Sequence, residues 1–313
     1  MNMLKLFISI ISLTFYISAF AVEPIQPIPV IPYDKEKAAL GKLLFSDVRL
    51  SVDDTISCES CHFLDKAGVD HVAKSIGVKG SINKRNSPTV FNSAFNFRQQ
   101  WDGRASDLEQ QIDMAMLNPR VMGMGSWKAV IKKVSSIDTY KERFKAIYGT
   151  EITAEQIQET IAEFERTLVT VNSPFDLYLK GDETAISEGA KRGYKLFKSY
   201  GCSSCHQGVN VGGNMFQKFG VLKDINLRGQ LNIDLGRHNV TGNEWDKRVF
   251  KVPSLRFAVH TAPYFHDGSV KTLREAIDIM TEFQLGRKVP DEHKNAIMEF
   301  LATLPGELPE GAK

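Results

Sequence analysis

The chain has 313 residues, of which 42% are hydrophobic and 24% are charged, as expected for one large or two ordinary globular domains. The formal net charge is only +2, and no block of Lys and Arg residues occurs. This charge pattern excludes the basic arm of a nucleic-acid-binding protein and does not indicate an anionic membrane surface as a partner.

Residues 1–21 have the pattern of a secretory signal peptide. Lys5 precedes an apolar run, and Ala19-Phe20-Ala21 matches the small-x-small sequence of a cleavage site. We expect cleavage after Ala21 and export to the periplasm, with an uncleaved membrane anchor as the alternative. No later segment reaches about 18 uninterrupted apolar residues, the length that a membrane-spanning helix needs.

The four cysteines of the chain lie in two pentapeptides, CESCH at 58–62 and CSSCH at 202–206. Two disulfides or a zinc site with four thiolate ligands would use the thiols but neither His62 nor His206. Covalent attachment of c-type haem uses every residue, because each thiol adds to a haem vinyl group and the adjacent His ligates the iron. The motifs therefore favour two c-type haems, bound by Cys58, Cys61 and His62 and by Cys202, Cys205 and His206.

Similar strings precede the two pentapeptides, GKLLF at 41–45 and GYKLF at 193–197. In each copy the Phe lies one helical turn beyond the Gly, on a short apolar helix that could pack against the edge of a haem. This repetition indicates two cytochrome c-like modules that arose by duplication.

The chain between the pentapeptides has mainly helical patterns. Residues 106–117 carry apolar side chains at helical spacing, and a capping box of Thr153 and Gln156 begins an amphipathic helix. Residues 170–182 break this periodicity with Asn, Pro and Gly, which places a domain boundary near 172.

The second half has a helix leading into Cys202, a long Gly-rich region at 208–270, and helices at about 272–283 and 291–304. We therefore predict a mainly α fold with little β structure and long loops. It consists of two tandem haem domains, 22–172 and 173–313.

Seven strings resemble those of the bacterial dihaem cytochrome c peroxidases, over essentially the whole mature length. They are ALGKLLFSDVRLS, CESCH, RNSPTVFN, WDGRASDLEQQ, GCSSCH, FKVPSLR and TAPYFHDGSVKTL. The resemblance implies that hydrogen peroxide reacts at the N-terminal haem, ligated by His62. Electrons from a small cytochrome c or a cupredoxin would enter at the C-terminal haem, ligated by His206.

The resemblance also implies roles for residues outside the haem motifs. Met280 matches the sixth ligand of the second haem, with Met215 as a fallback and Met298 as an ordinary core residue. Trp101 matches a tryptophan between the haems that assists electron transfer. The family's calcium site matches Asn86, Thr261 and Pro263, whose amide and carbonyl oxygens suit that cation. A homodimer is the family's typical assembly.

The first departure from the family pattern concerns the resting ligand of the N-terminal haem. Many members have a His in the loop before RNSPT, where this chain has Val78. Valine cannot coordinate iron, so we expect a five-coordinate first haem that needs no reductive activation. His71 is the possible substitute, although a solvent-exposed loop histidine is the simpler interpretation.

The second departure concerns the acid–base residue. The family's Glu, which moves a proton between the peroxide oxygens, is replaced by Val121 in NPRVMG, whereas Gln111 matches the accompanying distal residue. Arg120 is a possible electrostatic partner for a developing oxyanion. Asp113 and Glu109 lie two residues either side of Gln111, so their helix faces point elsewhere.

These departures leave three hypotheses. The first is a periplasmic dihaem cytochrome c peroxidase. The second is a dihaem oxidase similar to the protein that matures a tryptophan-derived quinone, against which Met280 argues because that relative has a tyrosine ligand. The third is a non-catalytic electron carrier or peroxide sensor, which Val121 favours.

Overall fold

The computed structural model describes residues 23–224 and 234–312, so the predicted signal peptide lies outside the described residues. Within these two ranges no helix is both long enough and apolar enough to cross a membrane. The α-helices are α1 (Lys35–Ser46), α2 (Leu108–Leu117), α3 (Trp127–Ser135), α4 (Asp138–Tyr148), α5 (Ala154–Thr167), α6 (Pro174–Leu179), α7 (Glu188–Ser199), α8 (His238–Thr241), α9 (Leu273–Ile279) and α10 (Asp291–Leu301). A π-helical turn, Met280–Gln284, continues α9.

The strands β1 (Phe216–Lys218) and β2 (Val249–Lys251) form a short antiparallel sheet in which Gln217 lies opposite Phe250. The remaining connections are loops and single 3₁₀ turns. The prediction of a mainly α fold with long loops and little β structure is confirmed.

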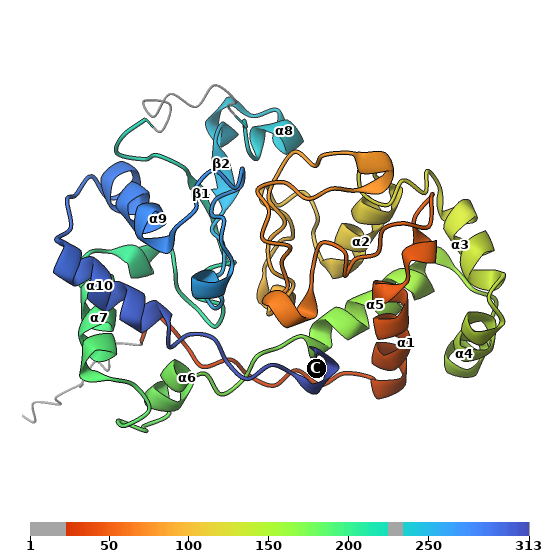
Figure 1. The fold of residues 1–313 in the computed structure, drawn as a ribbon, viewed down its shortest axis with the longest axis horizontal. Coiled ribbons are helices and arrows are strands. Elements are labelled where there is room, and N and C mark those ends of the chain that lie inside the picture. The colour runs from red at the N-terminus through yellow and green to blue at the C-terminus, as the bar shows by residue number, and fades with distance from the viewer. Residues whose placement is uncertain (1–22, 225–233, 313) are drawn as a thin grey trace, which may run out of the picture.

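Helix α1 packs closely on α5 in the N-terminal half (Figure 1). The contact passes through Gly41, where an added Cβ would lie only 2.1 Å from the carbonyl oxygen of Thr160. One turn later Phe45 is fully buried and meets Phe164 at a ring-centroid distance of 5.2 Å. A larger residue at 41 would therefore separate the helices and open this core.

Helix α7 packs on α10 in the C-terminal half in the same way (Figure 1). An added Cβ at Gly193 would lie 1.8 Å from the carbonyl oxygen of Ala296. The ring centroids of Phe197 and Phe300 are 5.1 Å apart. The Gly and the Phe of GKLLF and GYKLF thus have matching roles in helix packing. The close approach of two helices explains why the same string occurs twice.

The predicted helix signals are borne out with small shifts in the boundaries. The capping box is present, because the Thr153 side chain accepts from the backbone of Gln156 and the Gln156 side chain accepts from the backbone of Thr153. Helix α9 begins after the N-cap Thr272, whose side chain accepts from the N–H of Glu275. This start places Met280 at the end of the helix.

Both described ends of the chain cross between the two halves along one side of the molecule (Figure 1). Ile25 is buried in the C-terminal core, and the carbonyl of Pro24 accepts from Gly208 N–H at 2.7 Å. Ala312 is buried in the N-terminal core. The halves are therefore held together by segments from the opposite end of the sequence.

Candidate functional site

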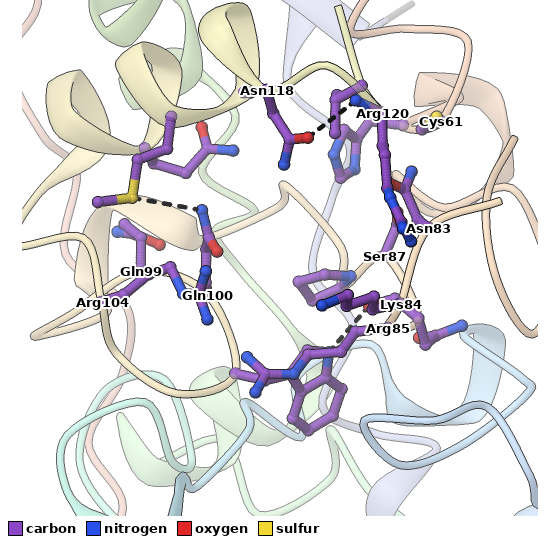
Figure 2. A pocket seen from close by; sticks show the side chains of 18 of the residues that line it. Cys61, Asn83, Lys84, Arg85, Ser87, Gln99, Gln100, Arg104, Asn118 and Arg120 are labelled. Atoms are coloured by element: carbon purple, nitrogen blue, oxygen red, sulfur yellow. Dashed lines mark hydrogen bonds between the residues drawn. The ribbon is translucent and has the colours of Figure 1, made fainter. Parts of the chain in front are cut away.

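The first cavity, of about 1210 Å³, is lined by Cys58, Cys61 and His62. The motif forms a single tight turn, in which the carbonyl of Cys58 accepts from the N–H groups of Cys61 and His62. This turn aims two thiols and an imidazole at the same space. Figure 2 shows Cys61 and Arg120 among the side chains that line this cavity.

The chemistry of these groups suits haem attachment. The ring Nδ1–H of His62 donates to the carbonyl of Gly68 at 3.2 Å, which leaves Nε2 free to ligate iron. Burial lowers the pKa of His62 and so favours the neutral ligating form. Burial also raises the pKa of Cys58 to about 12 and that of Cys61 to about 11. None of the four cysteines of the chain forms a disulfide.

The predicted peroxide-binding residues also line the first cavity. Helix α2 contributes Gln111, and the loop after α2 contributes Arg120 and Val121. The side-chain oxygen of Asn118 accepts from Arg120 N–H at 2.9 Å and holds this loop in a turn. Figure 2 shows Arg120 on the same side of the cavity as Asn83, across from Gln100.

The two carboxylates beside Gln111 in the sequence lie away from this cavity. Asp113 accepts a hydrogen bond from the indole N–H of Trp127 at 2.6 Å, and Glu109 forms an ion pair with Arg166 at 2.5 Å. Neither contributes to the cavity wall. The expectation from helix geometry that their faces point elsewhere is confirmed.

Three methionine side chains, Met114, Met116 and Met122, also line the first cavity. Met116 and Met122 are only 1% and 2% exposed because they pack in the N-terminal core. The sulfur of Met114 accepts from the side-chain amide of Gln100. The sulfur atoms of Met116 and Met122 therefore take part in core packing, and that of Met114 in a hydrogen bond.

Val78 and His71 lie outside the first cavity. Val78 is 1% exposed, and its N–H donates to the carbonyl of Val121 at 3.1 Å. His71 is exposed, and its Nδ1 is hydrogen-bonded to the carbonyl of Ala262 at 3.0 Å. The interpretation of His71 as a solvent-exposed loop residue agrees with this position.

The second cavity, of about 260 Å³, is smaller and is lined by Cys202, Cys205, His206 and Met280. The carbonyl of Cys202 accepts from His206 N–H at 3.0 Å, as in the first motif. Burial lowers the pKa of His206 to about 4, so the imidazole is neutral and able to ligate iron. The π-helical turn brings the Met280 thioether to the same cavity as this imidazole.

The other methionines considered as ligands do not reach this space. Met215 and Met298 are absent from the wall of the second cavity. Of the two repeated phenylalanines, Phe197 lines this cavity, whereas Phe45 packs on Phe164 behind the first. Met280 is therefore the methionine that the fold pairs with His206.

Trp101 lines both cavities. Its indole N–H donates to the carbonyl of Asn86 at 2.9 Å, and its own carbonyl accepts from Lys251 N–H at 2.7 Å. Its ring meets His266 edge-on at a centroid distance of 6.4 Å. The tryptophan is therefore held from both halves of the chain, at the boundary between the cavities.

The three predicted calcium residues line the second cavity, as Trp101 does. Asn86, Thr261 and Pro263 all line the second cavity, although they are far apart in the sequence. The side-chain NH₂ of Asn86 donates to the carbonyl of Val72 at 2.9 Å, which directs the amide oxygen away from that carbonyl. The donor set is one of amide and carbonyl oxygens, which suits Ca²⁺.

Sequence reasoning missed all three carboxyl residues that line the first cavity, Glu165, Asp234 and Asp267. Glu165 of α5 is 6% exposed. Burial, reinforced by the charge of Glu109, raises its pKa to about 8. Asp234 also lines this cavity, but its ion pair with Arg85 lowers its pKa to about 2. One sequence feature indicates that the Glu165 side chain is buried. The residue lies four positions after Ile161, on the apolar stripe of α5.

We expect Glu165→Gln to reduce the loss of stability that accompanies a rise in pH from about 4.5 to about 8. The raised pKa means that the folded state binds the proton more tightly than the unfolded chain, so stability falls as pH rises from about 4.5 to about 8. Relative to the wild type, the variant should therefore gain on the order of 4 kcal/mol of unfolding free energy between pH 4.5 and pH 8. Denaturant unfolding of the haem-loaded protein across this range measures the difference.

A matched control is Glu155→Gln, in the exposed first turn of the same helix. The pKa of Glu155 is lowered by hydrogen bonds to the Glu155 backbone and the Thr153 side chain, so this variant should gain no stability with rising pH. A stability difference for Glu165→Gln that does not change with pH would contradict the assignment of a protonated Glu165.

The residues of both cavities fit a c-type haem. Each cavity wall contains two thiols and one neutral imidazole from a single turn. The model of the di-haem cytochrome c peroxidase family matches residues 35–184. Cytochrome c551 peroxidase of Nitrosomonas europaea is 45% identical over 292 residues, which cover 93% of this chain and 86% of that protein.

The chain belongs to the di-haem cytochrome c peroxidase family. Cytochrome c peroxidase Ccp of Escherichia coli is 46% identical over 285 residues, which cover 91% of this chain but 61% of that protein. A solved MauG-like protein associated with microbial copper homeostasis is 29% identical, with a TM-score of 0.79 over 94% of this chain and 96% of that one.

The two departures from the family pattern are neighbours in space. The loop with Val78 and the loop with Val121 are joined by a backbone hydrogen bond. An added Cβ at Gly77 would lie 1.9 Å from the carbonyl oxygen of Arg120, so the two loops are in direct backbone contact. A histidine at 78 and a glutamate at 121 would therefore be close to one another in this di-haem peroxidase fold.

Proposed function

We propose that this di-haem peroxidase reduces hydrogen peroxide to two waters, using two protons and two electrons from a small cytochrome c or a cupredoxin. The proposal depends on the observation that Trp101 lines both of the cavities that contain a haem-attachment motif. These cavities differ in the residues that they offer to a haem iron. The second offers His206 and Met280 as a pair of iron ligands. The first contains both His62 and the amide of Gln111 among its lining residues.

When bound at His62, a haem supplies an iron with an open position at which peroxide is reduced. The Gln111 amide orients peroxide by hydrogen bonding. The Arg120 guanidinium stabilises negative charge as the oxygen–oxygen bond breaks. Glu165 carries a proton near neutral pH and is the acid that we assign to proton delivery in place of residue 121.

The second cavity receives the electrons. With a haem bound there, the imidazole of His206 and the thioether of Met280 would both hold its iron and would keep the structural change on reduction small. Trp101 lies between the cavities, and its hydrogen bonds to the backbone of Asn86 and Lys251 hold its ring in position. The tryptophan thereby assists transfer of each electron from the second site to the first.

The rest of the assignment follows the family pattern. Residues 22–172 form the peroxidatic haem domain, and residues 173–313 form the electron-transfer haem domain. The signal peptide exports the chain to the periplasm, where the four cysteines bind both haems covalently. Calcium binds at Asn86, Thr261 and Pro263, and two copies of the chain form a homodimer.

The decisive experiment is peroxide-dependent oxidation of a reduced small cytochrome c by the haem-loaded protein as isolated. Because Val78 cannot coordinate iron, we expect turnover without pre-reduction and a high-spin signal from the first haem. Absence of turnover, even after reduction of the second haem, would contradict the peroxidase proposal.

A second candidate is an oxidase acting on a partner protein, which the likeness to a MauG-like structure favours. Its discriminating result is oxidation of a protein by peroxide with no donor cytochrome present. Met280 on the wall of the second cavity argues against it. A carrier or sensor without turnover, which Val121 favours, would instead show a fully low-spin resting state.

A further inference from the structure

Lys251 of β2 is a buried lysine without a partner for its charge. Its side chain lines the second cavity and the residue is 7% exposed. Within residues 23–224 and 234–312, no hydrogen-bond acceptor or carboxylate contacts its ammonium group. Burial alone lowers its pKa to about 8.

The other buried cations of the described chain have partners. Arg256 forms an ion pair with Asp176 at 2.7 Å. Lys294 contacts Asp278 at 2.6 Å and Asp291 at 2.7 Å. Lys251 is thus the exception in a structure that otherwise compensates its buried positive charges.

The wall around Lys251 supplies no compensating charge. Among the described residues that line the second cavity there is no Asp or Glu, and the other lysine, Lys218 of β1, is exposed. The neighbours Phe250 and Val252 are buried and apolar. An ammonium group in such surroundings costs several kcal/mol unless an anion pairs with it.

We propose that Lys251 binds a propionate of the haem in the second cavity. Each haem carries two carboxylates, and the cavity that would contain this haem is the one lined by Lys251. The cofactor therefore completes an ion pair for which the protein provides only the cation. This proposal requires a haem at His206 but not peroxidase activity, so it can fail while the proposed function holds.

The backbone of Lys251 also contacts Trp101, the residue to which we assign electron transfer between the cavities. Its N–H donates to the carbonyl of Trp101 at 2.7 Å. The residue that pairs with the propionate therefore also positions the tryptophan between the cavities. A positive charge beside the second haem stabilises its reduced state, because reduction removes one positive charge from the iron.

The test is the midpoint potential of the second haem in Lys251→Met, which keeps the length of the side chain but removes its charge. We expect a negative shift that changes the ratio of oxidised to reduced haem at least tenfold at fixed potential, or about 59 mV for one electron. Spectroelectrochemical titration of the low-spin haem measures this shift without any assay of turnover.

Two matched variants sharpen the result. Lys251→Arg keeps the charge and should retain a potential near that of the wild type. Lys218→Met removes the exposed lysine of the same wall and should shift the potential much less, because solvent screens that charge. An unchanged potential in Lys251→Met, or an equal shift in Lys218→Met, would overturn the proposal.

A second measurement covers the case in which Lys251→Met does not fold. Resonance Raman bands from propionate bending report hydrogen bonding to these groups in the wild type and in Lys251→Arg. We expect bands of a hydrogen-bonded propionate at the second haem that shift between the two proteins. Bands of free propionates, identical in both, would also overturn the proposal.

Discussion

Replacing Val121 with glutamate should raise peroxide turnover about 10²-fold. The residue lines the first cavity together with Gln111 and Arg120, so a carboxyl group there faces the space that peroxide would occupy. General acid–base help contributes roughly 10²–10⁴-fold in typical enzymes, and Glu165 already supplies part of it in our proposal. The measurement is kcat for oxidation of a reduced small cytochrome c at saturating peroxide.

The matched control is Val121→Gln, which has nearly the same size as the glutamate variant but cannot donate a proton readily. It should leave kcat close to the wild-type value. In a Glu165→Gln background the gain from Val121→Glu should become larger, because the two acids serve the same step. Equal rates for the glutamate and glutamine variants would show that proton transfer does not limit turnover.

Replacing Met280 with leucine should convert the second haem from a low-spin to a high-spin state. Leucine fills similar space but provides no sulfur ligand in the cavity that residue 280 shares with His206. A thioether ligand raises the potential of a haem with a His ligand, so its loss should lower the potential by more than about 59 mV, a tenfold change in the redox equilibrium. Visible and electron paramagnetic resonance spectra measure the spin state, and a redox titration measures the potential.

The controls are the same substitution at Met215 and at Met298, neither of which lines the second cavity. Both variants should keep a low-spin second haem. Donor-driven turnover should fall about tenfold or more in Met280→Leu alone, because electrons enter less readily at the lower potential. A low-spin spectrum retained in Met280→Leu would mean that another group ligates this iron.

The sequence was sufficient for features that depend on neighbouring residues. The helix of residues 108–117 and the capping box of Thr153 and Gln156 follow from local periodicity and local hydrogen bonds. Each haem motif is contiguous, so its two thiols and its imidazole come from one turn regardless of the remainder of the fold. The mainly α fold could be predicted for the same reason.

Some longer-range placements could be predicted through the family resemblance. Met280 shares a cavity with His206, and Trp101 lines both cavities, although neither pairing follows from spacing alone. Asn86, Thr261 and Pro263 likewise all line the second cavity. Spacing alone could not have found these sites, because their members approach only after the two halves of the chain pack together.

Only the tertiary structure revealed the charges buried beside the cavities and the contact between the two departures from the family pattern. Glu165 and Lys251 look like surface residues by type, and burial is what makes them exceptional. The crossing of Ile25 and Ala312 into opposite cores also has no local signal. Local hydrogen bonds and periodicity depend on residues that are close in the sequence. Desolvation and electrostatic pairing depend instead on which distant segments enclose a side chain.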